Sequence, residues 1–510
     1  MHLLLAAISG VLLALAFPRF DAWWLAPVAL TPLTIALTRE FVPWRRFLLG
    51  WVMGVVFWAI TCNWIASVLE VHGGMGWWGG WGAFALFCVL KATHYGVFSL
   101  LGGVLVRHWY GPPAMALLWA GLERTQEPLT LFGWLMLGNA GIDQPIAMRL
   151  APYTGVYGIS FVFALMGICV ALLLLRRPRT YTAWVVFVLL PVFLPKLPEG
   201  LKPTATAVAV QPNFPVARDW TDELYMEQKR LLSALTLAAG EGKRPAMVLW
   251  PETPSPIFYE RDPDLQGRTR EITAALQAPM LLGSISRTAT GQVLNTAQFV
   301  SRNGERGDRY GKMFLVPFGE YVPELFSWVN QVSGEVGAYT PGKRLTTFTV
   351  DGRGVGAFIC YESAVPHHVR EFARAGAEVF VNLSNDGYFF ETAAREQHLS
   401  LVRMRAAENR RWVLRVTNNG ISASVDPSGA VRQSFPGFQA MAGTLGFGWR
   451  ADQTPYTRHG DWFAWIGLVL AGACLVVTQW PNYVDEKGKY PPAKPGALFR
   501  EPLKAAMRGR

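Results

Sequence analysis

The hydrophobic positions of this chain follow two patterns. Before residue 200 and again near the end they form long runs, and between these regions they form short runs separated by polar segments. A helix that crosses a bilayer needs roughly 17–25 apolar residues. Eight runs approach or reach that length: Leu3–Phe17, Trp23–Leu37, Phe47–Val68, Ala83–Val106, a run around Met115–Gly121, Gly155–Leu175, Tyr181–Leu194 and Trp462–Trp480. We therefore predict a polytopic α-helical membrane domain with about eight spans.

Basic residues follow every second apolar run. They are Arg39, Arg45 and Arg46 after the second run, Arg107 after the fourth, Arg176, Arg177 and Arg179 after the sixth, and a tail rich in Lys and Arg after the eighth. With eight spans all these loops lie on one side, and an excess of Lys and Arg marks the cytoplasmic side. The segment between the seventh and eighth runs is then predicted to lie outside the cytoplasm.

That segment has the short alternating pattern of an α/β domain. We predict strands at Ala205–Gln211, Ala246–Trp250, Met280–Ile285, Leu294–Ser301, Phe348–Val350, Gly354–Ile359, Glu378–Leu383, Trp412–Thr417 and Ile421–Val425. Thr221 is a plausible N-cap of a helix that runs to Ala239, and Glu391–Asn409 has helical periodicity. Asp351-Gly352 predicts a hairpin turn.

The predicted organisation has four parts. Residues 1–203 form a membrane domain with seven transmembrane helices, 204–456 the extracytoplasmic α/β domain, 457–480 the eighth helix and 481–510 a basic cytoplasmic tail.

Composition supports this division. The chain is 51% hydrophobic and 16% charged, whereas soluble domains carry about 25% charged residues. The net charge of +11 could suggest nucleic acid. The basic residues, however, lie between apolar runs and in the tail, so we expect no nucleic-acid partner. The five cysteines show neither a disulfide framework nor a zinc-site spacing, and phosphate-binding loops are missing, so we expect no metal and no cofactor.

Three predicted strands or their following turns end in a reactive group. Cys360 follows the strand Gly354–Ile359, Glu252 follows Ala246–Trp250, and Lys312 follows Tyr310-Gly311. Together a thiol, a carboxylate base and an ammonium could perform acyl transfer, with the N–H of Tyr361 as a second oxyanion donor. Each group also has an ordinary interpretation: a small buried side chain for Cys360, a helix cap for Glu252 and a solvated loop residue for Lys312. Spacing alone leaves both interpretations open.

Several motifs together resemble one family. They are Leu249–Glu252, Lys312–Pro323, Ile359–Glu362, Ser384-Asn385-Asp386, Arg403–Ala406 and Thr417–Gly420. These segments resemble the apolipoprotein N-acyltransferases, the membrane-bound branch of the nitrilase (carbon–nitrogen hydrolase) superfamily. The resemblance covers essentially the whole chain, and it implies a nitrilase-like αββα sandwich domain between the last two of eight spans.

The resemblance also implies an activity. The family moves an acyl chain from a phospholipid, through a cysteine thioester, to the α-amino group of the S-diacylglyceryl-cysteine of an apolipoprotein. It implies that Cys360 is the nucleophile, Glu252 the base and Lys312 the oxyanion holder. It further implies a bacterial inner-membrane, multi-pass enzyme that acts as a monomer in the lipid bilayer, with its catalytic domain on the periplasmic side.

Further positions match functional positions of the family. The resemblance implies that Glu320, Tyr361 and Glu362 support the active site, and that Trp220 and Tyr388 contact substrate. Tyr388 stands where a tryptophan is common in the family. From the residues alone, Glu320 and Glu362 could be surface acids or could pair with Lys312, and Trp220 could be a packing residue.

Other features have two interpretations each. Lys91 and His94 lie in the fourth apolar run, where they could face a lipid headgroup or, for Lys91, extend to the membrane surface. The adjacent His367 and His368 suggest a Cys–His nucleophile or a metal site, but neighbouring residues of a helix point in different directions. The apolar segment 325–329 could be a buried cluster or a lid that contacts the bilayer.

Two alternative functions remain compatible with the pattern. A membrane-tethered amidase would use the same three groups and release ammonia. A catalytically silent scaffold or lipid-flipping protein would have no need for all three groups.

Overall fold

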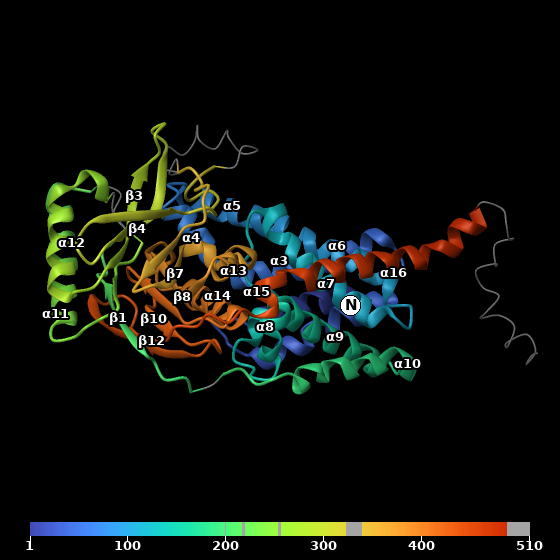
Figure 1. Ribbon diagram of the computed structural model, residues 1–510. Helices are drawn as coiled ribbons and strands as arrows, with labels where there is room; N and C mark the ends of the chain where they lie inside the picture. Colours follow the sequence, from blue (N-terminus) through green and yellow to red (C-terminus); the bar gives the residue numbers. More distant parts are fainter. Residues whose placement is uncertain (199, 217–219, 253–256, 323–338, 487–510) are drawn as a thin grey trace, which may run out of the picture.

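The computed structural model describes residues 1–198, 200–216, 220–252, 257–322 and 339–486. Figure 1 shows two parts: a bundle of helices and, beside it, a sandwich of two sheets covered by helices on both sides. We call residues 1–198 together with 455–486 the helical region, and residues 205–447 the sandwich domain.

The helical region begins with α1 and returns at the end of the chain with the long α16. Its elements are α1 (His2–Leu15), η1 (Trp23–Val28), α2 (Thr31–Arg39), α3 (Pro43–Thr61), α4 (Trp64–Val71), α5 (Gly76–Lys91), α6 (Thr93–Leu105), α7 (Gly111–Thr130), η2 (Leu137–Gly141), η3 (Ala147–Leu150), α8 (Ala151–Thr154), α9 (Val156–Leu174), α10 (Arg179–Thr182), η4 (Ala183–Phe193), α15 (Pro455–His459) and α16 (Trp462–Glu486).

Helix length only partly supports the predicted spans. Among the described residues, Gly76–Leu105 and Val156–Leu174 are long and apolar enough to cross a membrane. The pair α3 and α4 adds a third if it is counted as one span, although the two helices are bent by 62°. The prediction of eight spans is not established by helix length and stays a prediction.

Proline explains two departures from the predicted runs. The second run is divided into η1, which contains Pro27, and α2, which begins next to Pro32. The seventh run forms α10 and then the 3₁₀ helix η4, which contains Pro191. Proline removes a backbone donor and clashes with the preceding turn, so a continuous α-helix is not favoured at these places.

The sandwich domain contains two six-stranded sheets. The first has the order β12-β1-β2-β3-β4-β5 and the second β11-β10-β9-β8-β7-β6. The strands are β1 (Ala205–Gln211), β2 (Met247–Leu249), β3 (Met280–Arg287), β4 (Val293–Val300), β5 (Arg306–Gly311), β6 (Thr347–Val350), β7 (Arg353–Ile359), β8 (Ala377–Ser384), β9 (Val413–Thr417), β10 (Ala423–Val425), β11 (Val431–Ser434) and β12 (Met441–Phe447). Strands β1–β3 are parallel, as are β7–β9. The carboxyl ends of β2, β7 and β8 thus deliver Glu252, Cys360 and Asn385.

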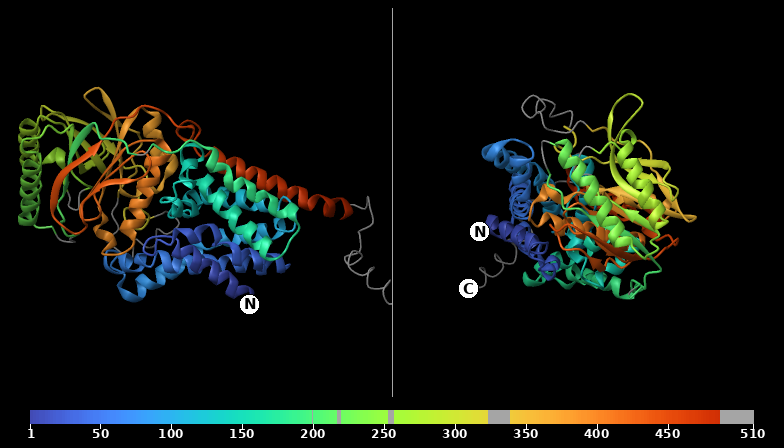
Figure 2. Two further views of the ribbon diagram at one scale, coloured as in Figure 1. Left: turned by 90° about the horizontal axis from the view of Figure 1, so that it is seen from below. Right: turned by 90° about the vertical axis from the view of Figure 1, so that its left-hand side faces the viewer.

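Helices cover both outer faces and produce the predicted αββα layers. The inner faces of the two sheets share one hydrophobic core, which includes Leu249 of β2 and Ala357 of β7. Helices α11 (Asp222–Gly240) and α12 (Pro263–Leu276) cover the first sheet, on the side farthest from the helical region (Figure 2). Helices α13 (Pro366–Arg374) and α14 (Ala394–Asn409) lie on the second sheet, next to the helical region (Figure 1).

The local predictions for the sandwich domain are confirmed with small changes of bounds. All nine predicted strands are present, and Thr221 caps α11 by accepting a hydrogen bond from the backbone N–H of Leu224. Asp351 and Gly352 form the turn between β6 and β7, with φ of 49° and 78°. Strands β5, β11 and β12 were not predicted, because β5 and β11 are polar and β12 contains two glycines.

Candidate active site

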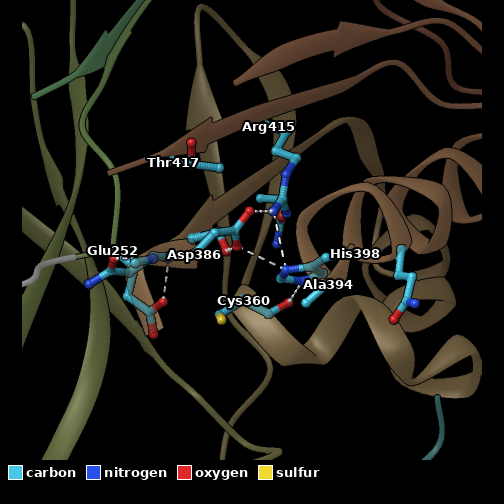
Figure 3. A network of polar contacts seen from close by, with 12 residues as sticks. Glu252, Cys360, Asp386, Ala394, His398, Arg415 and Thr417 are labelled. Atoms are coloured by element: carbon cyan, nitrogen blue, oxygen red, sulfur yellow. Dashed lines mark hydrogen bonds and ion pairs between the residues drawn. The ribbon is translucent and has the colours of Figure 1, made fainter. Parts of the chain in front are cut away.

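Cys360 occupies a sharp bend at the end of β7. Its φ is +50°, in the left-handed region, and the chain continues directly into the 3₁₀ helix η7 (Cys360–Ala364). A non-glycine residue in this conformation costs about 1–3 kcal/mol, so contacts around it must hold it in place. The bend turns the Cys360 sulfur toward Glu252 (Figure 3), and the residue is only 7% exposed.

Lys312 lies between two carboxylates on the sulfur side of this bend. Its Nζ is 2.9 Å from Glu320 Oε1 and 3.4 Å from Glu252 Oε1. The amide of Asn295 bridges the same two carboxylates, since its Nδ2 donates to Glu252 Oε1 at 2.7 Å and to Glu320 Oε1 at 2.9 Å. The backbone N–H of Asn385 donates to Glu252 Oε2 at 2.9 Å. Residues in or directly after β2, β4, β5 and β8 therefore hold the Glu252 carboxylate and the Lys312 ammonium in place.

Burial and these neighbours shift the pKa of the three groups. Burial raises the pKa of the Glu252 carboxyl, with Lys312 opposing this effect. Burial alone would lower the pKa of Lys312, but Glu252 and Glu320 outweigh it and hold the pKa well above its ordinary value. Burial and then Glu252 raise the pKa of the Cys360 thiol, which Lys312 opposes. The site therefore holds a neutral thiol beside a carboxylate with a raised proton affinity and the positive charge of Lys312.

Glu362 occupies neither of the two positions that the sequence suggests. It does not pair with Lys312 and is not a surface acid, because it is fully buried. Its Oε1 accepts hydrogen bonds from Tyr310 Oη (2.6 Å) and the backbone N–H of Met313 (2.7 Å), and Oε2 accepts from the backbone N–H of Ile359 (2.7 Å). Glu362 thus ties the end of β7 to the segment that carries Lys312.

Tyr361 points away from Lys312, into the helical region. Its hydroxyl accepts a hydrogen bond from the backbone N–H of Gly133 (3.0 Å) and donates to the carbonyl of Leu131 (3.3 Å). Its ring is stacked with Phe132 and Trp134, at centroid distances of 6.0 and 6.3 Å. The residue after Cys360 is therefore held by the segment that follows α7.

Trp220 and Tyr388 are the remaining predicted site residues. Tyr388 lies near the reactive groups, because burial and then the charges of Glu252, Tyr339 and Glu320 raise the pKa of its hydroxyl. The ring of Trp220 lies 6.5 Å from Phe214, and Tyr388 is 41% exposed with its ring 5.0 Å from His72. The structure brings Glu320 to Lys312, but substrate contacts of Trp220 and Tyr388 stay a prediction. The segment 325–329 lies outside the described residues.

His368 contacts a tyrosine and a carboxylate of the sandwich domain. His368 Nε2 is 2.9 Å from Tyr310 Oη and 3.3 Å from Glu362, so it supports the Glu362 contacts instead of the thiol. Within the described residues, no group of three or more His, Cys, Asp or Glu could hold a metal ion.

Lys91 does not extend to the membrane surface. It is 2% exposed, and its Nζ donates to Gln126 Oε1, Thr130 Oγ1 and the carbonyl of Phe132 at 3.0, 2.9 and 2.6 Å. Lys91 therefore holds, from within the helical region, the segment 131–134 that contacts Tyr361. His94 lies beside it, with Nε2 3.4 Å from Thr125 Oγ1.

Sequence reasoning missed three groups that contact the site. Asn295 lies inside a strand and belongs to no motif, so only the pairing of β4 with β5 reveals it. His398 lies in α14, and its contact with the carbonyl of Cys360 spans 38 residues. The buried ion pair of Asp386 and Arg415 contacts His398 (Figure 3). Asp386 belongs to the Ser384-Asn385-Asp386 motif, which by itself indicates no role for its side chain.

Comparison with known proteins gives consistent matches over both parts. A family model described as apolipoprotein N-acyltransferase N-terminal domain matches residues 9–169, and one described as carbon-nitrogen hydrolase matches residues 206–438. The chain is 30% identical to an apolipoprotein N-acyltransferase of Geobacter metallireducens, over 93% of this chain and 94% of that protein. It is 31% identical to one of Azotobacter vinelandii, over 94% of each chain. Among solved structures, an amidase from Nesterenkonia sp. matches 52% of this chain and 100% of its own, with 19% identity and a TM-score of 0.39.

Proposed function

The chain belongs to the apolipoprotein N-acyltransferase family, and from that premise we propose how its active site transfers an acyl chain. The family catalyses the last step of bacterial lipoprotein maturation, and this chain is an acyltransferase of that step. The nitrilase-like domain carries the reactive groups. The proposal concerns the acyl donor, the intermediate and the roles of the residues.

In the proposed first half-reaction the acyl donor is a phospholipid. The Cys360 sulfur attacks an ester carbonyl of the lipid while Glu252 takes the thiol proton. The oxyanion of the tetrahedral intermediate is held by the ammonium of Lys312 and the backbone N–H of Tyr361. When the intermediate collapses, the ester C–O bond breaks, the lysophospholipid oxygen receives the proton from Glu252, and a thioester remains on Cys360.

The second half-reaction uses the same groups in reverse. The free α-amine of a diacylated lipoprotein cysteine attacks the thioester carbonyl, and Glu252 takes the proton that the amine loses. The C–S bond then breaks, the amide is formed, and the sulfur regains its proton from Glu252. Glu320 and Asn295 support this cycle because they hold Lys312 and Glu252 at hydrogen-bond distance.

The observation that carries the proposal is the burial of the three reactive groups. Cys360, Glu252 and Lys312 are 7%, 7% and 1% exposed. A thioester in a site that excludes water is protected from hydrolysis until an amine arrives. The contact of Tyr361 with the helical region also supports a lipid donor, because it places the nucleophile directly at the edge of the apolar bundle.

A transfer assay tests the proposal. Purified protein is incubated with phospholipid and a synthetic diacylated lipopeptide, and the lipopeptide is analysed by mass spectrometry. We expect the wild type to add one acyl chain to the peptide α-amine and Cys360→Ala to add none. Cys474→Ala is the matched control, because that cysteine lies in α16 of the helical region. Release of ammonia or free fatty acid without acylated peptide would favour the amidase alternative.

We also propose that the chain is a multi-pass protein of the bacterial inner membrane with its sandwich domain on the periplasmic side. The support is the distribution of basic residues after every second apolar run. An alkaline phosphatase reporter fused at Arg302 should be active, and one fused after Lys489 should be inactive. A silent reporter at Arg302 would contradict both the orientation and the number of spans.

A further inference from the structure

The backbone carbonyl of Cys360 points away from the three reactive groups, toward α14. His398 Nε2 lies 3.0 Å from this carbonyl oxygen, and the histidine is fully buried. In Figure 3 the Cys360 sulfur and carbonyl oxygen leave the bend on opposite sides, the sulfur toward Glu252 and the oxygen toward His398. The proposed mechanism does not use this histidine.

The carbonyl of Cys360 and the N–H of Tyr361 belong to one peptide unit. This unit is planar and trans, so its C=O and N–H point in opposite directions. A hydrogen bond that fixes the Cys360 oxygen therefore also fixes the direction of the Tyr361 N–H. A donor to the carbonyl also polarises the unit, because hydrogen bonds in a chain strengthen one another.

The surroundings of His398 require a proton on Nε2. A carbonyl oxygen accepts hydrogen bonds and does not donate, so the contact at 3.0 Å is a bond only if Nε2 carries hydrogen. On the other ring edge, Nδ1 lies 3.0 Å from Asp386 Oδ1 and 3.2 Å from Arg415 Nη2. A neutral ring protonated at Nε2 accepts from Arg415, and a charged ring donates to Asp386. Nε2 is a donor in both states.

The ion pair of Asp386 and Arg415 holds the Nδ1 edge of His398 in place. Arg415 Nη2 donates to Asp386 Oδ2 at 2.6 Å, and both residues are fully buried. Burial would raise the pKa of Asp386, but Arg415 and His398 lower it overall, so the carboxylate stays ionised. Ser384 Oγ also donates to Asp386 Oδ1 at 3.0 Å.

The neighbouring residue anchors the same helix to the helical region. Gln397 Oε1 accepts from the indole N–H groups of Trp64 (3.3 Å) and Trp134 (3.0 Å). Its Nε2 donates to the carbonyls of Pro18 and Thr61, both at 2.9 Å. All the hydrogen-bonding capacity of this buried amide is thus used to hold α14, so His398 has little freedom to move away from Cys360.

We propose that His398 is a positioning residue for the oxyanion: its Nε2–H orients and polarises the Cys360–Tyr361 peptide so that the Tyr361 N–H binds the developing negative charge. The proposal rests on the acyl-transfer function proposed above. It assigns His398 no proton transfer and no contact with substrate. His398 should therefore matter for reactions of Cys360 at a carbonyl and not for reactions that form no oxyanion.

Two reagents separate these reactions. A short-chain p-nitrophenyl ester acylates Cys360 through a tetrahedral oxyanion, whereas methyl methanethiosulfonate modifies the same sulfur without one. Both products are followed on the Cys360 peptide by mass spectrometry. His398→Gln and His398→Asn form a matched pair, because the longer amide reaches the position of Nε2 and the shorter one reaches only that of Nδ1. His367→Asn is the control, since it places the same change on α13.

We expect His398→Gln to acylate within about tenfold of the wild type, because a donor to the carbonyl remains. His398→Asn should acylate about a hundredfold more slowly, because the Tyr361 N–H is then no longer held in the direction of the oxyanion and its contribution as a donor is lost. Modification by methyl methanethiosulfonate should be unchanged in both variants, and His367→Asn should behave as wild type in both reactions. If His398→Asn does not fold, as judged by its thermal unfolding, His398→Leu replaces it in the same comparison.

Equal acylation rates for the Gln and Asn variants would overturn the proposal. A parallel loss in both reactions would also overturn it, because it would show that His398 only maintains the shape of the bend. The ester assay does not depend on the lipid donor. If wild type reacts with the ester but not with phospholipid, the proposed donor fails while the role of His398 is still decided.

Discussion

Glu252 and Glu362 are two buried carboxylates of the sandwich domain with opposite properties. Burial raises the pKa of Glu252, although Lys312 opposes this shift. Burial acts in the same direction on Glu362, but there His368 and the hydrogen bonds outweigh it and the pKa is lowered. The difference lies in the neighbours, because a second carboxylate, Glu320, lies next to Glu252, whereas Glu362 is surrounded by donors.

The comparison shows that two buried carboxylates of one domain can have different roles, depending on their neighbours. A carboxylate with a raised pKa is ready to accept a proton, which is what a general base near neutral pH requires. A carboxylate whose every neighbour is a donor is stable as an anion and holds the backbone around it. We infer that the groups on the sulfur side of Cys360 take part in acyl transfer. Glu362, by contrast, holds the backbone around Cys360 in position.

The largest expected effect of a change on the reactive side comes from Lys312→Met. The aliphatic stem is kept and the positive charge is lost, so the fold should survive while the oxyanion loses a donor. The loss of transition-state stabilisation should be about 3–4 kcal/mol. The rate of acyl transfer in the lipopeptide assay should therefore fall roughly a hundredfold or more.

The control for this change is Lys343→Met, because Lys343 is an exposed lysine of the following loop region. It should leave transfer unchanged. Near-normal transfer by Lys312→Met would show that the oxyanion is held by other groups, and it would remove Lys312 from the reactive side of the comparison.

A smaller effect, on stability instead of chemistry, is expected from Glu362→Gln. An ionised carboxylate with several buried donors should contribute about 2–3 kcal/mol through its hydrogen bonds. Its pKa is lower in the folded state, so this contribution is present above the ordinary value of 4.5 and is lost as the pH falls through the folded pKa. Thermal unfolding as a function of pH should show that the Gln variant is less stable at neutral pH and that the difference shrinks in acid.

Glu252→Gln provides the matched opposite. Because the folded-state pKa of Glu252 is raised, its ionisation opposes folding, and removing the charge should leave stability at neutral pH unchanged or higher. Equal destabilisation by the two changes would mean that both carboxylates are structural and that the comparison is wrong.

The sandwich could be predicted from the sequence because its strands are apolar and clearly separated. The positions of Glu252 and Cys360 followed from the ends of such strands, and the parallel arrangement of β2 and β7 within their sheets brings the two residues toward one edge. The polar β5 gave no such pattern, although it carries the chain to Lys312. The sequence therefore indicated the positions of Glu252 and Cys360, but it did not indicate the strand β5 that leads to Lys312.

The supporting contacts could not be predicted because they join distant parts of the chain. Nothing in the segment around Tyr361 indicates that its hydroxyl contacts Gly133, which is 228 residues away. Likewise, the helical periodicity around His398 predicts α14 but not which face of that helix meets Cys360. The sequence left a pairing of Glu362 with Lys312 open for the same reason. The donors that Glu362 meets are the Tyr310 hydroxyl and the backbone N–H groups of Met313 and Ile359, which the local sequence does not reveal.

The acyl-enzyme is the most direct test of the account. Purified protein is incubated with phospholipid alone, and the peptide that contains Cys360 is weighed. We expect one fatty-acyl mass on Cys360, removed by hydroxylamine at neutral pH and discharged by a diacylated lipopeptide with a free α-amine but not by its N-acetylated form. Glu252→Gln should not load, because the thiol then lacks its base. Steady release of fatty acid or ammonia with no adduct on Cys360 would contradict the account.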